Sequence, residues 1–161
     1  MDEPKIRKIT DEKTGLSKAE HYCAYQERSQ QEVRDKLYEW GLYPQQVESI
    51  ISKLIEANYL NEERFAKEYT RGKFNQKAWG KVKIKQGLKQ KQVPDKLIKK
   101  ALDTIDKSEY YATLENLLKK KAATIHEIND FKRRYKLQQY AMGRGFESEL
   151  ITAVLKEMET K

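Results

Sequence analysis

Apolar residues recur at helical spacing along most of the chain. The clearest stripe runs through Val47, Ile50, Ile51, Leu54 and Ile55, and its i, i+3, i+4, i+7, i+8 spacing gives an amphipathic helix one apolar face. Gly and Pro number only seven and three among the 161 residues. Long helices are therefore easier to build from this chain than turn-rich sheets, and the sequence predicts an all-α protein.

Start and stop signals divide the first part of the chain into three short helices. Their expected starts are two capping boxes and a proline, at Ser17, Ser29 and Pro44. The first helix is expected to end near Glu27, with Ala24 and Tyr25 among its buried residues. The second should end before Gly41, a residue suited to the left-handed position that follows many helices.

The stretch from Asn58 to Ala66 leads into a second group of three helices. Asn61 is a good N-cap residue, and Leu60 and Phe65 have the spacing of a hydrophobic staple. The two glutamates after the cap are expected to stabilise the helix through its dipole. A third group starts near Ser108. Its second helix is expected to begin with a capping box at Thr124 and to carry Ile128, Phe131 and Tyr135.

The three groups align with one another as an internal repeat. A shift of 51 residues relates the first group to the second, and a shift of 53 relates the second to the third. The aligned apolar sets are Val33/Ile84/Leu137, Leu37/Leu88/Ala141, Leu42/Val93/Phe146, Val47/Ile98/Ile151, Ile50/Ala101/Val154 and Ile51/Leu102/Leu155. The residue after the second helix reads Gly41, Gln92 and Gly145. If all three are left-handed, Gln92 is strained by roughly 1 kcal/mol.

A repeat of this length predicts an elongated, curved array of three tandem three-helix repeats, about nine helices in all. We place a flexible N-terminal tail at residues 1–16 and the repeats at 17–57, 58–106 and 107–161. Each small repeat buries little alone and leans on its neighbours. Such an array presents long surfaces, which suit an extended partner.

Basic residues are concentrated in the second repeat. Between Arg71 and Lys100 there are eleven Lys and Arg residues and one acidic residue, Asp95, in a chain whose net charge is +8. A row of ammonium groups binds polyanions by counterion release, with strong salt dependence and little sequence preference. The candidate binding residues are Arg71, Lys73, Lys77, Lys81, Lys83, Lys85 and Lys89, with a second cluster at Lys132, Arg133 and Arg134.

Lysine-rich faces are also common as merely solvated surface, so the near-absence of acidic residues over thirty positions is what favours a binding site. Lys81, Lys85 and Lys89 are four residues apart, so they lie along one side of the expected middle helix. Trp79 lies among these lysines. It could stack on a base or, as is more usual for such a tryptophan, pack at a helix junction.

No catalytic or metal-binding constellation is recognisable. The chain has no P-loop, no Gly-x-Gly-x-x-Gly and no His-Glu-x-x-His, and His21, Cys23 and His126 are too few and too scattered for a metal site. We therefore expect neither an enzyme nor a cofactor. The single cysteine allows no intramolecular disulfide, which fits a reducing cytoplasm. No stretch approaches the roughly 20 apolar residues of a membrane span.

Two motifs resemble those of the RecX family of regulatory proteins. Residues 59–66, Tyr-Leu-Asn-Glu-Glu-Arg-Phe-Ala, resemble that family's Tyr-Leu-Asp-Asp-Glu-Arg-Phe-Ala signature. Residues 79–84, followed by Leu88 and Lys91-Gln92-Val93, resemble its Gly-x-x-Arg-Ile-x-x-x-Leu-x-x-Lys-Gly-Val segment. The resemblance covers about residues 18–158. Asn61, Lys83 and Gln92 depart from the usual Asp, Arg and Gly, which leaves open how strongly this member binds.

The resemblance implies a bacterial, cytoplasmic modulator of the RecA recombinase, with a role in DNA recombination, DNA repair and the SOS response. Such proteins lie in the groove of the RecA–DNA filament and usually block its extension, ATPase and strand exchange. We expect a monomer whose basic second repeat faces single-stranded or duplex DNA, or acidic RecA surfaces, while the outer repeats bridge RecA subunits. The residues leave two alternatives open: a stand-alone, non-specific nucleic-acid-binding helical-repeat protein, and an adaptor that binds only protein.

Overall fold

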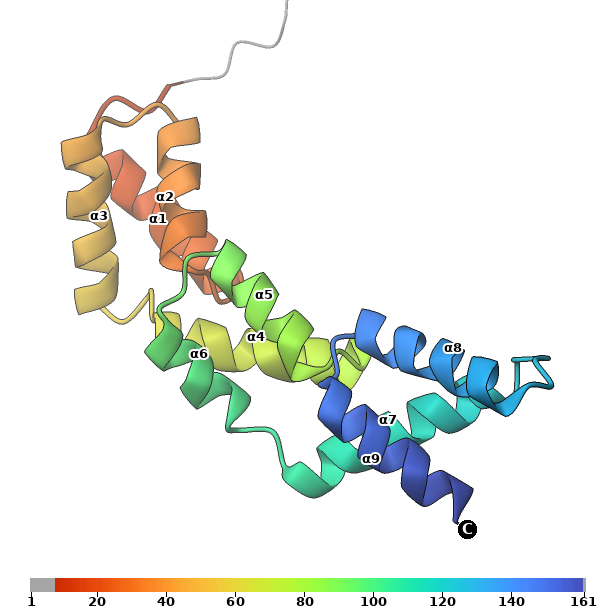
Figure 1. The fold of residues 1–161 in the computed structure, drawn as a ribbon. Helices are drawn as coiled ribbons and strands as arrows, with labels where there is room; N and C mark the ends of the chain where they lie inside the picture. The colour runs from red at the N-terminus through yellow and green to blue at the C-terminus, as the bar shows by residue number, and fades with distance from the viewer. Residues whose placement is uncertain (1–7, 161) are drawn as a thin grey trace, which may run out of the picture.

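A computed structural model describes residues 8–160, and within this range the chain forms nine helices and no strand (Figure 1). The helices are α1 (Glu12–Tyr25), α2 (Gln30–Glu39), α3 (Pro44–Glu56), α4 (Glu62–Lys77), α5 (Lys81–Gln90), α6 (Asp95–Leu102), α7 (Lys107–Ala122), α8 (Asp130–Gly143) and α9 (Ser148–Glu159). The helix pairs that pack extensively fall within three groups, α1–α3, α4–α6 and α7–α9. We call these groups units 1, 2 and 3. They follow one another in an elongated, bent array, so the predicted all-α fold of three tandem three-helix repeats is confirmed.

The repeat found in the sequence forms the buried framework of each unit. Of the eighteen aligned apolar positions, seventeen are buried, and the remaining one, Leu102, packs partly buried against the core. The turn after the second helix also repeats, because Gly41, Gln92 and Gly145 have φ values of 95°, 59° and 94°. All three positions are thus left-handed, which is the condition under which the sequence predicts strain at Gln92.

The first helix begins earlier than the sequence predicts. Asp11 is the N-cap of α1, and its carboxylate accepts the Thr14 backbone N–H at 2.9 Å. Ser17 therefore lies inside the helix and caps nothing, and residues 12–16 are helical rather than part of a tail. The remainder of the expected tail, residues 1–7, lies outside the described residues.

The buried face of α1 also differs from the expected one. It consists of Gly15, Ala19 and Cys23, spaced four residues apart. Ala24 is exposed and Tyr25 is 83% exposed, at the end of the helix. Burial raises the pKa of the Cys23 thiol to about 11, so this thiol is protonated at neutral pH and packs as a small apolar residue.

The second helix of unit 3 begins later than predicted. The Thr124 hydroxyl donates to the Lys121 carbonyl at 2.8 Å, so it belongs to the end of α7 rather than to a capping box. Asn129 is the true N-cap, accepting the Lys132 backbone N–H at 3.0 Å. The apolar residues expected along this helix are instead largely exposed: Ile128 at 94%, Phe131 at 81% and Tyr135 at 57%.

The buried residues form two separate cores. Unit 1 has a core of its own, to which Leu60 belongs. Units 2 and 3 share the other core, which includes Phe65. Leu60 and Phe65 therefore anchor the connecting segment to different cores and do not act together as a staple. The two junctions of the array consequently differ in kind.

Aromatic rings fill the junction between units 2 and 3. The Tyr110 ring centroid lies 5.9 Å from that of Phe74 and 5.1 Å from that of Phe146, so rings from α4, α7 and the turn before α9 pack together. The Tyr110 hydroxyl accepts the Lys81 backbone N–H at 2.9 Å and donates to the Glu147 carboxylate. The hydroxyl is thus fully used although the ring is buried.

Backbone hydrogen bonds join the same two units. Gly80 N–H donates to the Arg144 carbonyl at 2.8 Å, and Val82 N–H donates to the Gly145 carbonyl at 2.9 Å. The approach is so close that a Cβ at Gly80 would lie 2.3 Å from the Gly145 backbone. The Arg144 guanidinium also donates to the Lys77 carbonyl. The start of α5 is therefore fixed directly to the turn between α8 and α9.

The junction between units 1 and 2 is polar. The Glu62 carboxylate accepts the Gln30 backbone N–H, at the start of α2, at 2.8 Å, and burial raises the pKa of Glu62. Glu62 was expected only to interact with its own helix dipole, but it also crosses the junction. The ion pairs across the junction are Arg64–Glu27 and Lys91–Glu32, the latter at 3.6 Å.

Replacing Gln92 with glycine should stabilise the protein. Glycine adopts the left-handed conformation without a Cβ penalty, so we expect the free energy of unfolding to rise by about 1 kcal/mol. Gln92→Ala is the matched control, because it keeps a Cβ at the same φ. Urea denaturation measures both variants. Equal stabilisation by Gly and Ala would contradict the strain at this position.

Gly80→Ala should weaken the junction between units 2 and 3. The added Cβ must displace the Gly145 backbone, and overpacking of this kind costs about 1–3 kcal/mol. Gly72→Ala is the control: it lies within α4, and nothing lies within 4 Å of its added Cβ, so it should stabilise by up to about 1 kcal/mol. In both thermal and urea unfolding, Gly80→Ala should lower the stability and Gly72→Ala should raise it. A Gly80→Ala variant as stable as the wild type would contradict the close approach.

Candidate binding surface

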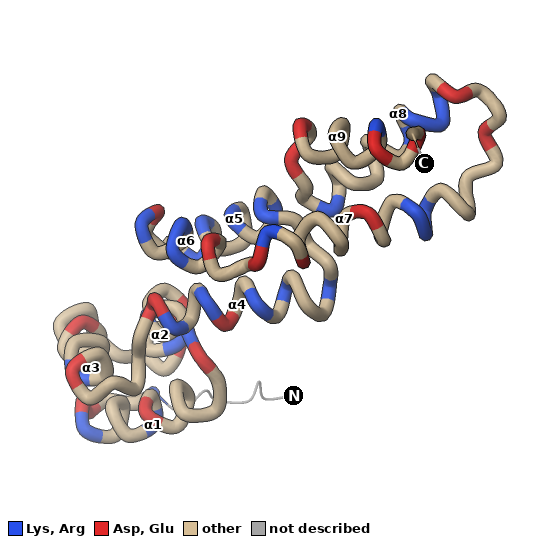
Figure 2. Tube along the Cα trace, turned by 90° about the horizontal axis from the view of Figure 1, so that it is seen from below, with Lys and Arg blue, Asp and Glu red and all other residues tan. Residues whose placement is uncertain are grey.

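Positive charge is concentrated in the middle of the array. Residues 17–57 contain five Lys and Arg against seven Asp and Glu, residues 58–106 contain thirteen against six, and residues 107–161 contain eleven against eight. Figure 2 shows the basic positions of α4, α5 and α6 in the middle of the trace. Unit 2 is therefore the strongest candidate for polyanion binding.

Lys81, Lys85 and Lys89, which we call the lysine row, lie along one flank of α5. Ile84 and Leu88 are buried, and the row lies beside them on the side of α6. Lys89 pairs with Asp95 at 3.8 Å. Side chains of both helices line a cavity of about 390 Å³, and its polar lining is Lys81, Lys85, Asp95, Lys99 and Asp103. The structure thus brings the row together and adds Lys99 to it.

The other flank of α5 faces α4. Here Lys83, Gly87 and Lys91 follow one another at four-residue intervals. Tyr69 of α4 lies across the helix at Gly87, so closely that a Cβ at Gly87 would be 2.1 Å from the tyrosine hydroxyl oxygen. The glycine that costs α5 helix propensity therefore makes room for Tyr69. The lysines of α5 are thus split between two flanks.

Trp79 lies between lysines of α4 and α5. Its ring centroid is 4.8 Å from Lys73 Nζ and 4.6 Å from Lys83 Nζ, and Lys73 Nζ is also 5.4 Å from the Tyr69 ring centroid. Trp79 packs against the shared core while remaining partly exposed. We call Tyr69, Lys73, Trp79 and Lys83 the Trp79 cluster. The sequence analysis singled out the tryptophan as a candidate but not Tyr69, because the place of Tyr69 over Gly87 is set by tertiary packing.

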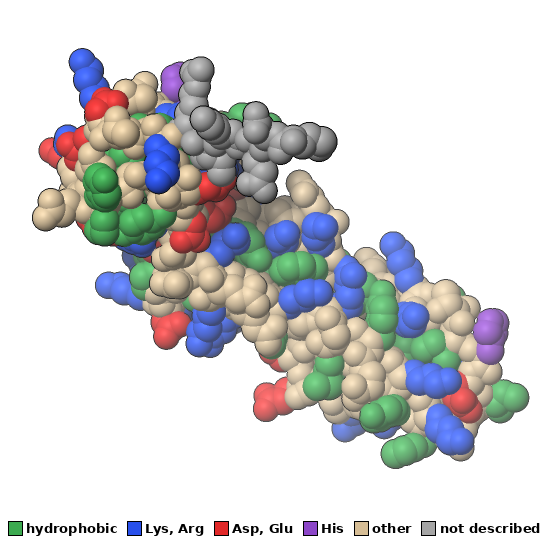
Figure 3. Space-filling view, turned by 90° about the horizontal axis from the view of Figure 1, so that it is seen from above, with side chains coloured by type: hydrophobic (Ala, Val, Ile, Leu, Met, Phe, Trp, Pro, Cys, Tyr) green, Lys and Arg blue, Asp and Glu red, His purple; other side chains and the backbone are tan. Residues whose placement is uncertain are grey.

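The remaining candidate binding residues of unit 2 differ in their exposure and in their existing partners. Arg71 pairs with Glu68 on its own helix at 3.5 Å. Lys81 is only partly exposed, and its ammonium lies 5.0 Å from the Tyr110 ring centroid. Lys77 and Lys85 are exposed, and neither forms an ion pair within residues 8–160. Figure 3 shows Lys and Arg side chains, with hydrophobic ones among them, along the middle of one face.

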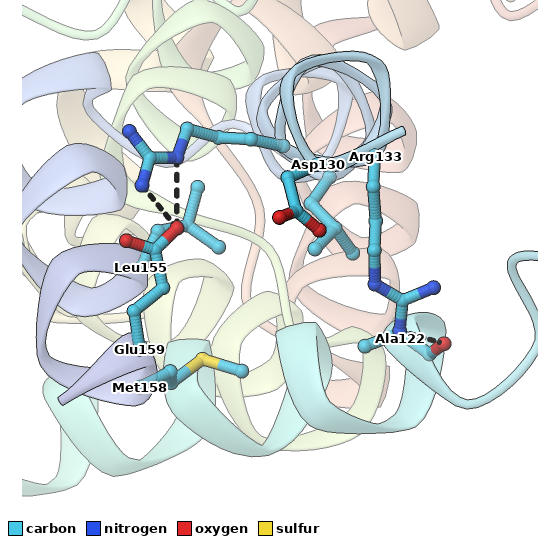
Figure 4. A pocket seen from close by; sticks show the side chains of 8 residues that line it. Ala122, Asp130, Arg133, Leu155, Met158 and Glu159 are labelled. Atoms are coloured by element: carbon cyan, nitrogen blue, oxygen red, sulfur yellow. Dashed lines mark hydrogen bonds and ion pairs between the residues drawn. The ribbon is translucent and has the colours of Figure 1, made fainter. Parts of the chain in front are cut away.

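Two of the three basic residues predicted in unit 3 serve its own structure (Figure 4). Arg133 donates to the Ala122 carbonyl at 2.7 Å and to the Ile125 carbonyl at 2.8 Å, which satisfies the end of α7. Arg134 pairs with Glu159 of α9. They border a cavity of about 550 Å³. Lys132 is exposed on α8. The cluster is thus separate from the lysines of α5 and is largely engaged within unit 3.

Among residues 8–160, no group of three or more His, Cys, Asp and Glu side chains could hold a metal ion. In the same range, no helix has the length and apolar character needed to cross a bilayer.

The chain matches family models over three consecutive segments. They are described as the first, second and third three-helix domains of RecX, and they match residues 16–54, 61–102 and 108–155. Each segment lies within one of the three units.

Whole proteins and a solved structure are similar over nearly the full chain. A regulatory protein RecX of Prosthecochloris aestuarii is 30% identical, over 94% of this chain and 97% of its own length. One of Oceanobacillus iheyensis is 28% identical, over 98% of this chain and 60% of its own length. The crystal structure of RecX from Lactobacillus salivarius superimposes with a TM-score of 0.86 at 25% identity, covering 93% of this chain and 97% of that one.

The relatives differ in length. The chain spans about 60% of the length of the Oceanobacillus protein and 51% of the Bacillus cereus relatives, but nearly all of the Prosthecochloris protein.

Proposed function

The chain belongs to the RecX family of regulatory proteins, and we propose that it binds the RecA recombinase filament on DNA and inhibits its extension, ATPase and strand exchange. The proposal describes a non-enzymatic regulator that acts through binding surfaces. The alternative that the sequence leaves open is a stand-alone, non-specific nucleic-acid-binding protein. It predicts DNA binding without any effect on RecA.

The observation that carries the proposal is the excess of lysine on unit 2, between a unit with more acidic than basic residues and a unit with a modest basic excess. The phosphates of the filament's DNA would attract this surface at many positions along the DNA, because ammonium–phosphate contacts do not depend on base sequence. Junction contacts between units 2 and 3 hold α5 in place, so the helix presents the lysines of its two flanks in a preformed arrangement.

A contact with RecA itself is assigned to α8 of unit 3. The support comes from α8, where Phe131 and Tyr135 are exposed one helical turn apart, and from Ile128 just before this helix, which is also exposed. Exposed apolar groups of this kind favour protein interfaces over solvent. An elongated array could then bridge neighbouring RecA subunits while unit 2 lies on DNA, and one bound molecule would restrain several subunits.

Charge reversal on α5 tests the DNA contact. Lys85→Glu with Lys89→Glu should raise the concentration needed to inhibit the RecA DNA-dependent ATPase, and should lower the salt slope of DNA binding by about 2. Lys81 is left intact because its ammonium lies at the junction with unit 3. Lys13→Glu with Lys53→Glu makes the same charge change at exposed positions of unit 1 and, like the change at Lys89, removes one exposed ion pair, here with Glu12 at 3.6 Å. Unchanged inhibition by the α5 variant, or equal loss in the unit 1 control, would reject the basic surface.

Substitution on α8 tests the protein contact. Phe131→Ser with Tyr135→Ser should weaken binding to preformed RecA filaments by about tenfold or more, since apolar anchors often carry an interface. Stability should change by no more than about 0.5 kcal/mol, because both rings are exposed. Tyr25→Ser with Tyr43→Ser, also exposed at 83% and 72%, is the matched control in unit 1. Filament pull-down and ATPase assays measure the effect, and wild-type binding by the α8 variant would exclude this face.

A further inference from the structure

The Trp79 cluster differs from the surroundings of the other tryptophan in the chain. Trp40 has one ammonium over its ring, Lys18 Nζ at 4.7 Å, and its ring meets Tyr22 edge-on at 6.2 Å. Trp79 has two ammoniums within 4.8 Å of its ring centroid. Within residues 8–160, neither Lys73 nor Lys83 forms an ion pair with a carboxylate. Both cations therefore lie over aromatic rings, Lys83 over Trp79 and Lys73 over Trp79 and Tyr69.

The position of the Trp79 ring does not depend on the lysines. Ala78 adopts a left-handed conformation with φ of 52°, and the Trp79 N–H donates to the Lys73 carbonyl at 3.1 Å. The next residue, Gly80, is bonded to the Arg144 carbonyl. The inner part of the ring packs on the core shared by units 2 and 3. The two flexible lysine side chains could therefore leave the ring without moving it.

An indole flanked by two mobile ammoniums matches the chemistry of single-stranded nucleic acid. An unpaired base has a free π-face that stacks on tryptophan whatever its sequence, and its neighbouring phosphates bind lysine. Each lysine would exchange a cation–π contact for a charge-assisted contact with phosphate. A duplex keeps its base faces stacked on one another, so it could engage the lysines but not the ring.

We infer that the Trp79 cluster is a stacking site for an unpaired base, with Lys73 and Lys83 binding the flanking phosphates. The inference rests on the proposed function in placing DNA on unit 2, and it adds that this part of the surface selects single strands. The lysine row of α5 lies on the other flank of the helix and binds phosphate without such selection. An acidic peptide is the competing occupant, since it would also attract the two lysines.

The experiment reads the ring directly and needs no RecA. In a Trp40→Phe background the full chain has Trp79 as its single tryptophan. Its emission is followed during titration with an oligothymidylate of about 16 nucleotides, with a duplex of the same length, and with a poly-glutamate peptide. We expect strong quenching by the oligothymidylate and little by the other two. Absent quenching, or equal quenching by duplex or poly-glutamate, would overturn the stacking site.

Two further variants separate the ring from the cations. Trp79→Leu should bind a labelled oligothymidylate about 5- to 100-fold more weakly, the range for loss of one stacked base, while duplex binding stays near the wild-type value. Lys73→Gln with Lys83→Gln should keep the ring and reduce both the affinity and its salt slope. Trp79→Phe, which retains an aromatic face, should recover part of the affinity. If Trp79→Leu weakened single-strand and duplex binding equally, the ring would have no stacking role.

These results are distinguishable from failure of the proposed function. Loss of quenching with intact inhibition of the RecA ATPase would refute the stacking site alone. Quenching that persists in a protein without effect on RecA would support the stacking site and reject RecA regulation.

Discussion

The contact between the start of α5 and the turn after α8 determines how the rest of the array is arranged. Gly80 approaches the Gly145 backbone so closely that no side chain fits between them. Two backbone hydrogen bonds and a cluster of three aromatic rings then join the units. Because units 2 and 3 also share one core, they form a single body. This contact fixes the start of α5 and the backbone beside Trp79 relative to unit 3.

The junction between units 1 and 2 uses the same device with different chemistry. Gln30 and Lys81 are equivalent in the 51-residue repeat, and each is the first residue of the second helix in its unit. Each donates its backbone N–H to a side chain on the first helix of the next unit, Glu62 in one case and Tyr110 in the other. Between units 1 and 2 the acceptor is a carboxylate, with ion pairs nearby. Between units 2 and 3 the acceptor is the hydroxyl of an aromatic ring that lies inside a core. The motif at residues 59–66 therefore does more than start α4, since it also fastens unit 1.

The helical period and the two repeat shifts were sufficient to predict the fold and the buried framework that the three units share. They did not predict the buried face of α1 or the exposure of Phe131 and Tyr135 on α8. They also failed at two helix starts, where two candidate caps lie a few residues apart. Ser17 and Thr124 have the pattern of a capping box, yet Asp11 and Asn129 accept the first-turn N–H groups. Sequence spacing also placed the basic residues on helices but could not say which were already engaged. Arg133 binds carbonyls of its own unit, and the passage of Tyr69 over Gly87 is a tertiary contact without local signal.

Under the proposed function, the charge distribution and the two junctions favour a direction for DNA phosphates along the array. Unit 1 has more acidic than basic residues, and unit 3 has more basic than acidic residues. Phosphates lying on α5 would therefore be repelled at the unit 1 end of the array and attracted toward unit 3. The ion pairs that fasten unit 1 are partly solvent-exposed and weaken as salt rises, whereas the contacts between units 2 and 3 are buried and largely unscreened. Added salt would thus weaken both the contact between units 1 and 2 and the binding of phosphate by lysine. The Trp79 ring would stay in place. Stacking on that ring should be the least salt-sensitive part of binding, because it involves no counterion release.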